Sequence, residues 1–331
     1  MFPRTIVSDW NLVCTNRWLV HVVSGKWRTI IPVIYQLPFG LANTAMALLA
    51  YWLRDWRKLE FALASISSLF IVYWFFIPES PRWLIATGRT HEAFDILRKV
   101  AKFNGRSFHR KRVKFMLSKY SMPRDRKKNE PGILAFLTSK NMRLKTILLT
   151  LSWFCTGLTF YTFAQNLGSI GGNVFIAVAV TGILSAGGGL TCVYIVTKVG
   201  RKVTICIYQA ITTSCFILIQ LLPRHFDSDW LHLMIAGIGF AGMAGTVPAL
   251  YLFSGELYPT VGRNVGLSCV STFARIGSMI APFLVLLDTI VPHLTLAILT
   301  IVSGSQILMI LPLPETKDMP LPNTLEEAER I

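Results

Sequence analysis

Charged side chains are scarce in this 331-residue chain, at 15% of all residues, against about a quarter in soluble domains. A soluble protein of this length needs more polar surface than this to cover its core. The apolar residues, which make up 53% of the chain, gather in long runs, and a membrane-spanning helix requires roughly 20 of them in succession. The composition therefore predicts an integral, multi-pass membrane protein.

Motifs of several other protein classes are absent. The six cysteines form no CxxC pair, which leaves no support for a zinc or redox site. No P-loop occurs, and no His–Cys or Ser–His pairing has a motif context, so we predict no cofactor, no metal site and no enzymatic activity. The first residues lack the apolar run of a signal peptide. Acidic residues are few, 17 against 33 basic ones, but the basic residues lie between apolar runs, so membrane topology explains them better than nucleic-acid binding.

Eight apolar runs predict an all-α membrane protein, because backbone polar groups in lipid must be satisfied within the chain. The runs cover residues 29–53, 61–78, 144–164, 170–196, 203–222, 231–254, 264–287 and 290–313. Prolines at positions 32, 38, 248 and 282 predict kinks or breaks within these helices. The glycines of "AGGG" (186–189) indicate either tight helix packing or a hinge.

A long polar segment, residues 79–142, is rich in Lys and Arg, so the positive-inside rule places it in the cytoplasm. Within it, "THEAFDILRKVAKF" (90–103) spaces its apolar side chains as an amphipathic helix does. That helix would either lie on the membrane surface or be part of a solvated basic loop. The same orientation puts residues 197–202, 255–263 and the C-terminal tail on the cytoplasmic side.

Four stretches together resemble one family. They are "PESPRWLIATGR" (78–89), "GRK" (200–202), "ELYPTVGRNVG" (256–266) and "LPETKDMPLPNTLEEAE" (313–329). The chain is similar in these stretches to the organic cation/anion/carnitine transporter family of the major facilitator superfamily. The resemblance implies a bundle of two six-helix halves that rock around a midplane binding site, located in the plasma membrane.

The resemblance also implies that the first four of twelve spans are missing. "TIVSDWNLVC" (5–14) is similar to the end of the family's large extracellular loop, yet only a short stretch separates it from the first apolar run. We therefore expect a remnant of that loop and of the second span (1–28), two spans of the N-terminal half (29–78), the cytoplasmic loop (79–142), a complete C-terminal half (143–313) and a cytoplasmic tail (314–331).

Arg275 is the candidate for substrate binding. It lies twelve residues beyond Arg263, which corresponds to about 18 Å along a helix. A charge at that depth costs at least about 2.5 kcal/mol and is a functional candidate. The family resemblance implies pairing with a substrate carboxylate, since arginine occupies this position in the anion and carnitine branches. The alternative is a structural pair with another helix.

Aromatic and polar residues would complete the substrate site. By resemblance these are Phe160, Tyr161, Tyr251, Gln36 and Phe39; aromatic rings give contact area and cation–π contacts, although each ring could instead serve packing. The family's Glu-Leu-Pro-like motif is replaced here by residues 185–187, which favours a zwitterion or a monoanion.

A cytoplasmic gate is the second expected site. The resemblance assigns to it Glu79, Arg82, Arg201, Glu256 and Arg263, whose ion pairs would hold the inner side closed in one state and break in the other. Each of these charges could equally be a solvated residue at the membrane interface.

Two functions remain open at this point. The first is transport of a small organic ion (an anion, a zwitterion such as carnitine, or a cation) by alternating access. The second is a non-transporting membrane protein: a truncated isoform, an incomplete gene model or a regulatory fragment that associates with full-length transporters. The expected partners are the substrate and the lipid bilayer, and no nucleic acid.

Overall fold

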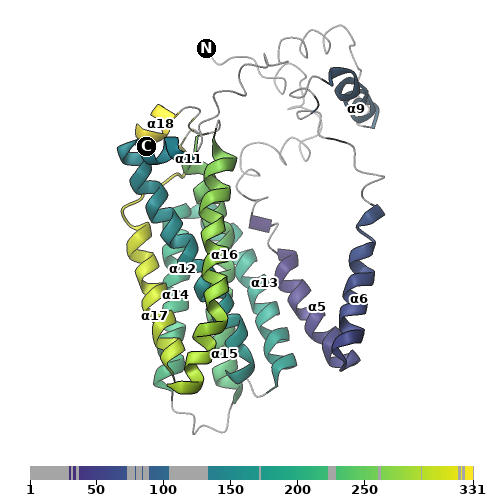
Figure 1. Cartoon of the computed structure of the whole chain (residues 1–331), viewed down its shortest axis with the longest axis vertical. Helices are drawn as coiled ribbons and strands as arrows, with labels where there is room; N and C mark the ends of the chain where they lie inside the picture. Colours follow the sequence, from purple (N-terminus) through teal and green to yellow (C-terminus); the bar gives the residue numbers. More distant parts are fainter. Residues whose placement is uncertain are drawn as a thin grey trace. The chain divides into compact units, whose positions relative to one another are not determined.

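The computed structural model describes residues 30, 33–34, 37–72, 79, 84, 89–103, 133–170, 173–222, 229–259, 262–291, 293–319, 322 and 325–330. This part of the chain contains helices and no strands (Figure 1). The "TIVSDWNLVC" stretch, Gln36 and Arg82 lie outside the described residues.

The chain divides into two units. One consists of residues 1–17 and 55–130, and the other of residues 18–54 and 131–331. In the first unit the described helices are α6 (Trp56–Ser68) and α9 (Thr90–Phe103). In the second they are α5 (Leu37–Leu53), α11 (Ile133–Thr138), α12 (Lys140–Ile170), α13 (Val174–Lys198), α14 (Arg201–Leu221), α15 (Asp229–Leu257), α16 (Arg263–Ile290), α17 (Leu294–Ile310) and α18 (Leu325–Arg330).

Five helices of the described residues are long and apolar enough to cross a membrane: α12, α13, α14, α15 and α16. They confirm the third to seventh expected spans. The eighth expected span, 290–313, is present as the shorter apolar helix α17, which has 17 residues. Prolines at positions 292 and 312 flank this helix, and proline restricts helix continuation on both sides. The multi-pass membrane architecture expected from composition is confirmed.

Three of the expected proline positions fall on described helices. Pro248 and Pro282 lie inside α15 and α16, which continue through them without a break. Pro38 lies in α5, and because residues 35–36, directly before this helix, lie outside the described part of the chain, the disturbance expected at Pro38 stays a prediction.

Small residues bring the backbones of α5 and α13 close together. On α5 and α13, a Cβ added to Gly40 would lie 2.7 Å from the backbone nitrogen of Ala186, and one added to Gly182 would lie 2.4 Å from Oγ1 of Thr44. The hydroxyl of Thr44 also donates to the carbonyl of Ala179 at 3.1 Å. We call this contact the α5–α13 seam; such close approach allows dispersion and hydrogen bonds to hold helices together where lipid gives no hydrophobic driving force.

The "AGGG" stretch serves packing at one of its positions. The helix α13 runs unbroken through residues 187–189, and a Cβ on Gly188 would lie 2.3 Å from the carbonyl oxygen of Ala241 on α15. The tight-packing interpretation therefore accounts for Gly188.

The expected amphipathic helix is present as α9. Ala93 and Ala101 are buried, whereas Val100 is 45% exposed. At the start of α9, Arg89 donates two hydrogen bonds to Glu92 in the first turn. Contact of this helix with the membrane stays a prediction.

Candidate functional site

A cavity of about 210 Å³ lies within the second unit. It brings together residues of α5, α12, α13, α15 and α16, which are far apart in sequence. Five of the six predicted substrate residues line it: Phe39, Phe160, Tyr161, Tyr251 and Arg275. Its size, below the roughly 300–1,000 Å³ of drug-binding pockets, suits a small organic molecule. The binding role of these residues stays a prediction.

The cavity wall is largely aromatic. The ring of Phe160 lies 6.0 Å from that of Phe39 on α5 and 5.4 Å from that of Tyr161, centroid to centroid. On the other side, Trp153 and Tyr251 make an edge-on contact at 4.4 Å. Such a wall provides apolar area and π faces for the body of a ligand.

Arg275 is the one charged residue among the described residues that line the cavity. Its Nη1 donates to the carbonyl of Ser271 at 2.8 Å, and no described carboxylate lies within ion-pair distance of it. Among the described residues, Arg275 therefore has no partner for the structural ion pair that was the alternative to substrate binding. An exposed guanidinium keeps donors available for an anion.

Glycines fix the position of Arg275 along the helix pair α12–α16. A Cβ on Gly157 would lie 2.0 Å from the carbonyl oxygen of Ala274, and one on Gly277 would lie 2.5 Å from that of Phe154. The backbone on both sides of Arg275 is therefore pressed against α12, so the guanidinium projects from a rigid support.

Behind the cavity, a buried polar chain joins four helices. Gln306 of α17 donates from Nε2 to Oγ1 of Thr156 at 2.9 Å and accepts a hydrogen bond from Gln209 of α14. Thr246 of α15 donates to Gln209 at 3.3 Å. These side chains are at most 6% exposed. Their mutual hydrogen bonds offset the cost of placing amides in a membrane interior and give Thr156, which lines the cavity, a fixed orientation.

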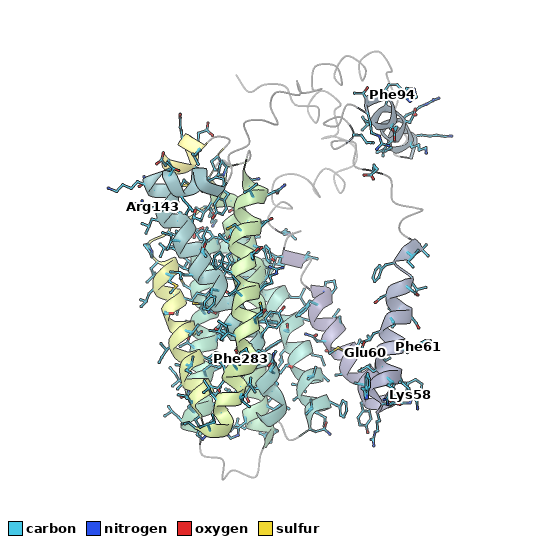
Figure 2. All side chains as sticks on the ribbon, viewed as in Figure 1. Lys58, Glu60, Phe61, Phe94, Arg143 and Phe283 are labelled. Carbon is cyan, nitrogen blue, oxygen red and sulfur yellow. The ribbon has the colours of Figure 1, made fainter. Side chains whose placement is uncertain are left out.

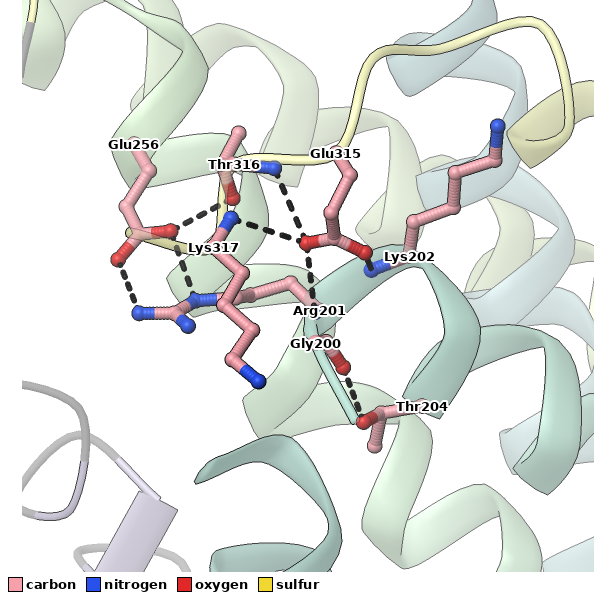
Figure 3. A network of polar contacts seen from close by, with 8 residues as sticks. All are labelled: Gly200, Arg201, Lys202, Thr204, Glu256, Glu315, Thr316 and Lys317. Atoms are coloured by element: carbon pink, nitrogen blue, oxygen red, sulfur yellow. Dashed lines mark hydrogen bonds and ion pairs between the residues drawn. The ribbon is translucent and has the colours of Figure 1, made fainter. Parts of the chain in front are cut away.

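Two of the predicted gate residues form a buried ion pair. Arg201 donates from Nε and Nη2 to the two carboxylate oxygens of Glu256 at 2.9 and 3.0 Å. Their side chains are 9% and 11% exposed. The hydroxyl of Thr316 donates to the same carboxylate at 2.6 Å (Figure 3).

Glu315 ties the C-terminal tail to the start of α14. Its carboxylate accepts from the backbone N–H groups of Arg201 and Lys202 at 2.8 and 3.0 Å (Figure 3), which satisfies donors at a helix N-terminus and opposes the positive end of its dipole. Gly200 precedes the helix with φ of 123°, and a Cβ there would lie 2.7 Å from Oε2 of Glu315. The "GRK" and "PETK" motifs therefore contact each other in the structure.

The other gate candidates lie elsewhere. Arg263 begins α16, and its guanidinium lies 3.4 Å from the carbonyl of Tyr258. Tyr258 is fully buried against Phe136 and Gly266, and burial raises the pKa of its phenol to about 12. Glu79 is exposed in the first unit. The pKa of Arg89 is raised there, mainly by the hydrogen bond that Arg89 donates to Glu92 and also by the negative charges of Glu92 and Glu79.

Sequence reasoning missed several residues of these sites. Trp153 and Thr156 line the cavity, but nothing in their local sequence distinguishes them from packing residues. Ser185, which stands where the family has its Glu-Leu-Pro-like motif, also lines it. Glu315 and Thr316 belong to the charge network, and their signal was the "PETK" motif, which identified the family and was not assigned a contact.

Known proteins match most of the chain. Solute carrier family 22 member 3 of Mus musculus is 31% identical over 95% of this chain, and the organic cation transporter protein of Drosophila melanogaster is 31% identical over 94%. Solute carrier family 22 member 12 of Rattus norvegicus is 29% identical over 96%. The chain spans only 56% to 57% of the length of these relatives, which is consistent with the expected absence of four spans.

The fold also matches a solved structure, that of the major facilitator superfamily proton:xylose symporter XylE bound to 6-bromo-6-deoxy-D-glucose. The TM-score is 0.66 at 16% identity, over 94% of this chain and 68% of that one. At this identity the likeness shows the fold alone. The sequence profile described as "Sugar (and other) transporter" matches residues 26–330. The chain therefore belongs to the sugar (and other) transporter family and has the fold of the major facilitator superfamily.

Proposed function

We propose that the chain takes part in secondary transport of a small organic ion across the plasma membrane, and that this ion carries a carboxylate. The observation that carries the proposal is the lone guanidinium of Arg275 in a cavity whose other described lining residues are aromatic, hydroxyl-bearing or small. A guanidinium binds a carboxylate with two parallel charge-assisted hydrogen bonds. An uncompensated cation in the cavity disfavours a substrate that is only positively charged.

The aromatic wall supports a substrate with an apolar or cationic second end. Phe160, Tyr161 and Tyr251 offer rings to an alkyl, aryl or quaternary ammonium group. Monocarboxylates and zwitterions of the carnitine type satisfy both features. An organic cation without a carboxylate satisfies only one, although the Drosophila relative is named for organic cation transport.

Alternating access is the proposed mechanism, with no enzymatic step. The α5–α13 seam and the predicted gate pair Arg201–Glu256 are the contacts that such a cycle would break and remake. The cavity residues would then face each side of the membrane in turn.

Binding and uptake should be measured separately with the purified full chain and with cells that express it. Probes are a radiolabelled aryl monocarboxylate, carnitine and a tetraalkylammonium ion. We expect the first two to bind, and Arg275→Ala to weaken them about ten- to hundredfold, the value of a lost charge-assisted hydrogen bond. Arg98→Ala, an exposed arginine of α9, is the matched control and should change nothing.

The outcomes distinguish the two functions. Tight binding of the tetraalkylammonium ion, insensitive to Arg275→Ala, would refute the carboxylate assignment. Arg275-dependent binding without uptake above the vector control, despite surface expression, would refute transport by this chain and favour a membrane-embedded regulatory protein that acts with full-length transporters.

A further inference from the structure

A second cavity, of about 310 Å³, lies where the tail meets the start of α12. One face of α12 supplies Asn141, Leu144, Lys145 and Leu148, which follow the i, i+3, i+4, i+7 spacing of a single helix stripe. The facing residues are Pro312–Pro314 and Glu329. This cavity has no residue in common with the proposed transport site.

Lys145 is the unusual residue of this cavity. It is only 8% exposed, it has no ion pair within 4 Å among the described residues, and its single hydrogen bond in that part of the chain goes to the carbonyl of Ala328 at 2.8 Å. An ammonium group has three N–H donors. Two of them therefore lack a described hydrogen-bond partner. The negative charge of Glu329 acts on the ammonium from beyond ion-pair distance, but it does not supply these hydrogen bonds, and buried donors left without acceptors are costly. A ligand with acceptor oxygens would remove that cost.

Glu329 supplies the opposite charge at the same cavity. One of its carboxylate oxygens, Oε1, accepts from the hydroxyl of Ser139, while its backbone carbonyl accepts from Nδ2 of Asn141 at 3.3 Å. No described residue donates to the other oxygen, Oε2. The cavity thus presents free donors from Lys145 and a free acceptor from Glu329 within one space.

The two polar residues that α12 contributes to the cavity, Asn141 and Lys145, lie in its first two turns. Asn141 comes first, and Leu148 lies seven residues further on, about 10 Å deeper along the helix axis. The cavity begins with the same residues as the membrane span, Lys140–Leu167. The opposite wall contains two prolines, which have no N–H to donate. A polar end at the membrane boundary with an apolar continuation below it matches the headgroup and glycerol region of a phospholipid.

We propose that this cavity binds a phospholipid whose headgroup carries both a phosphate and a primary ammonium, that is, an ethanolamine phospholipid. The phosphate oxygens accept from Lys145 Nζ, and the ammonium donates to Glu329 Oε2. A choline headgroup has no N–H to donate, and a purely anionic headgroup meets the Glu329 carboxylate without compensation. The bound lipid joins α12 to the tail helix α18.

The test uses the full chain, purified in detergent, with native mass spectrometry of bound phosphatidylethanolamine, phosphatidylcholine and phosphatidylglycerol. We expect phosphatidylethanolamine to be retained about tenfold over phosphatidylcholine, the effect of one charge-assisted hydrogen bond. Lys145→Gln should abolish retention of all three. Glu329→Gln should keep retention but remove the preference for ethanolamine over choline.

Arg143→Gln is the matched control, since this basic residue lies in the first turns of α12 (Figure 2) and is not among the residues that line the cavity. This variant should bind lipid as the unaltered chain does. Equal retention of ethanolamine and choline lipids by the unaltered chain would overturn the proposal, as would strongest retention of phosphatidylglycerol or unchanged retention in Lys145→Gln. If Lys145→Gln fails to fold, an ethanolamine preference that persists in Glu329→Gln would overturn it.

Discussion

The Arg201–Glu256 pair should behave as one energetic unit. Both side chains are about nine-tenths buried, and their two hydrogen bonds measure 2.9 and 3.0 Å. Neutralising either partner alone, by Arg201→Gln or Glu256→Gln, removes the charge-assisted hydrogen bonds between the two side chains while the other charge stays buried, at a cost of about 3–5 kcal/mol. In the double variant neither charge remains. We therefore expect its loss to fall short of the sum of the two single losses by about 2–3 kcal/mol.

The free energy of unfolding can be measured by equilibrium unfolding in mixed detergent micelles, followed by circular dichroism. The same cycle on Arg89 and Glu92 is the control, because the two hydrogen bonds of that pair are even shorter, 2.7 and 2.6 Å, but its side chains are 48% and 51% exposed. An exposed pair is worth only about 0–1 kcal/mol. If the stability loss of the double variant equals the sum of the two single losses within about 0.5 kcal/mol, the reasoning that burial makes this pair strong is refuted.

Three further variants test the packing described above. Gly200→Ala should destabilise the chain by about 1–3 kcal/mol, because its φ of 123° suits glycine and a Cβ would press on Glu315; unfolding as stable as that of the unaltered chain would contradict this. The phenol of Tyr258, whose pKa is raised to about 12, binds its proton more tightly in the folded state, so stability should fall by up to about 3 kcal/mol as pH rises from about 10 to 12, and Tyr258→Phe should remove that part of the pH dependence. Gly182→Val should push α5 from α13, since the added carbons meet Thr44; an unchanged cross-linking yield between cysteines placed on the two helices would contradict the seam.

The long helices could be predicted from the sequence because lipid permits few other backbone structures. The extent of α17 could not, since hydropathy continues past the prolines that bound it. Residues of the cavity such as Phe39 and Arg275 were selected by family resemblance together with depth along a helix, and their meeting in one cavity required the packing of distant helices.

The hydrogen bonds of the C-terminal tail could not be predicted from sequence patterns, for a different reason. Glu315 meets Arg201 across 114 positions, and Lys145 meets Ala328 across 183. Periodicity reports which face of one helix is apolar, and it contains no information about which distant segment covers a polar group.

Trp153 gives the cavity an optical property of its own. Its indole is 2% exposed, donates from Nε1 to Ser254 at 3.0 Å and touches the ring of Tyr251. Trp52, Trp56 and Trp230 are between 64% and 83% exposed, so among the described tryptophans the indole at the cavity is the one enclosed by protein. A ligand that enters the cavity would change the emission of this indole without any attached dye.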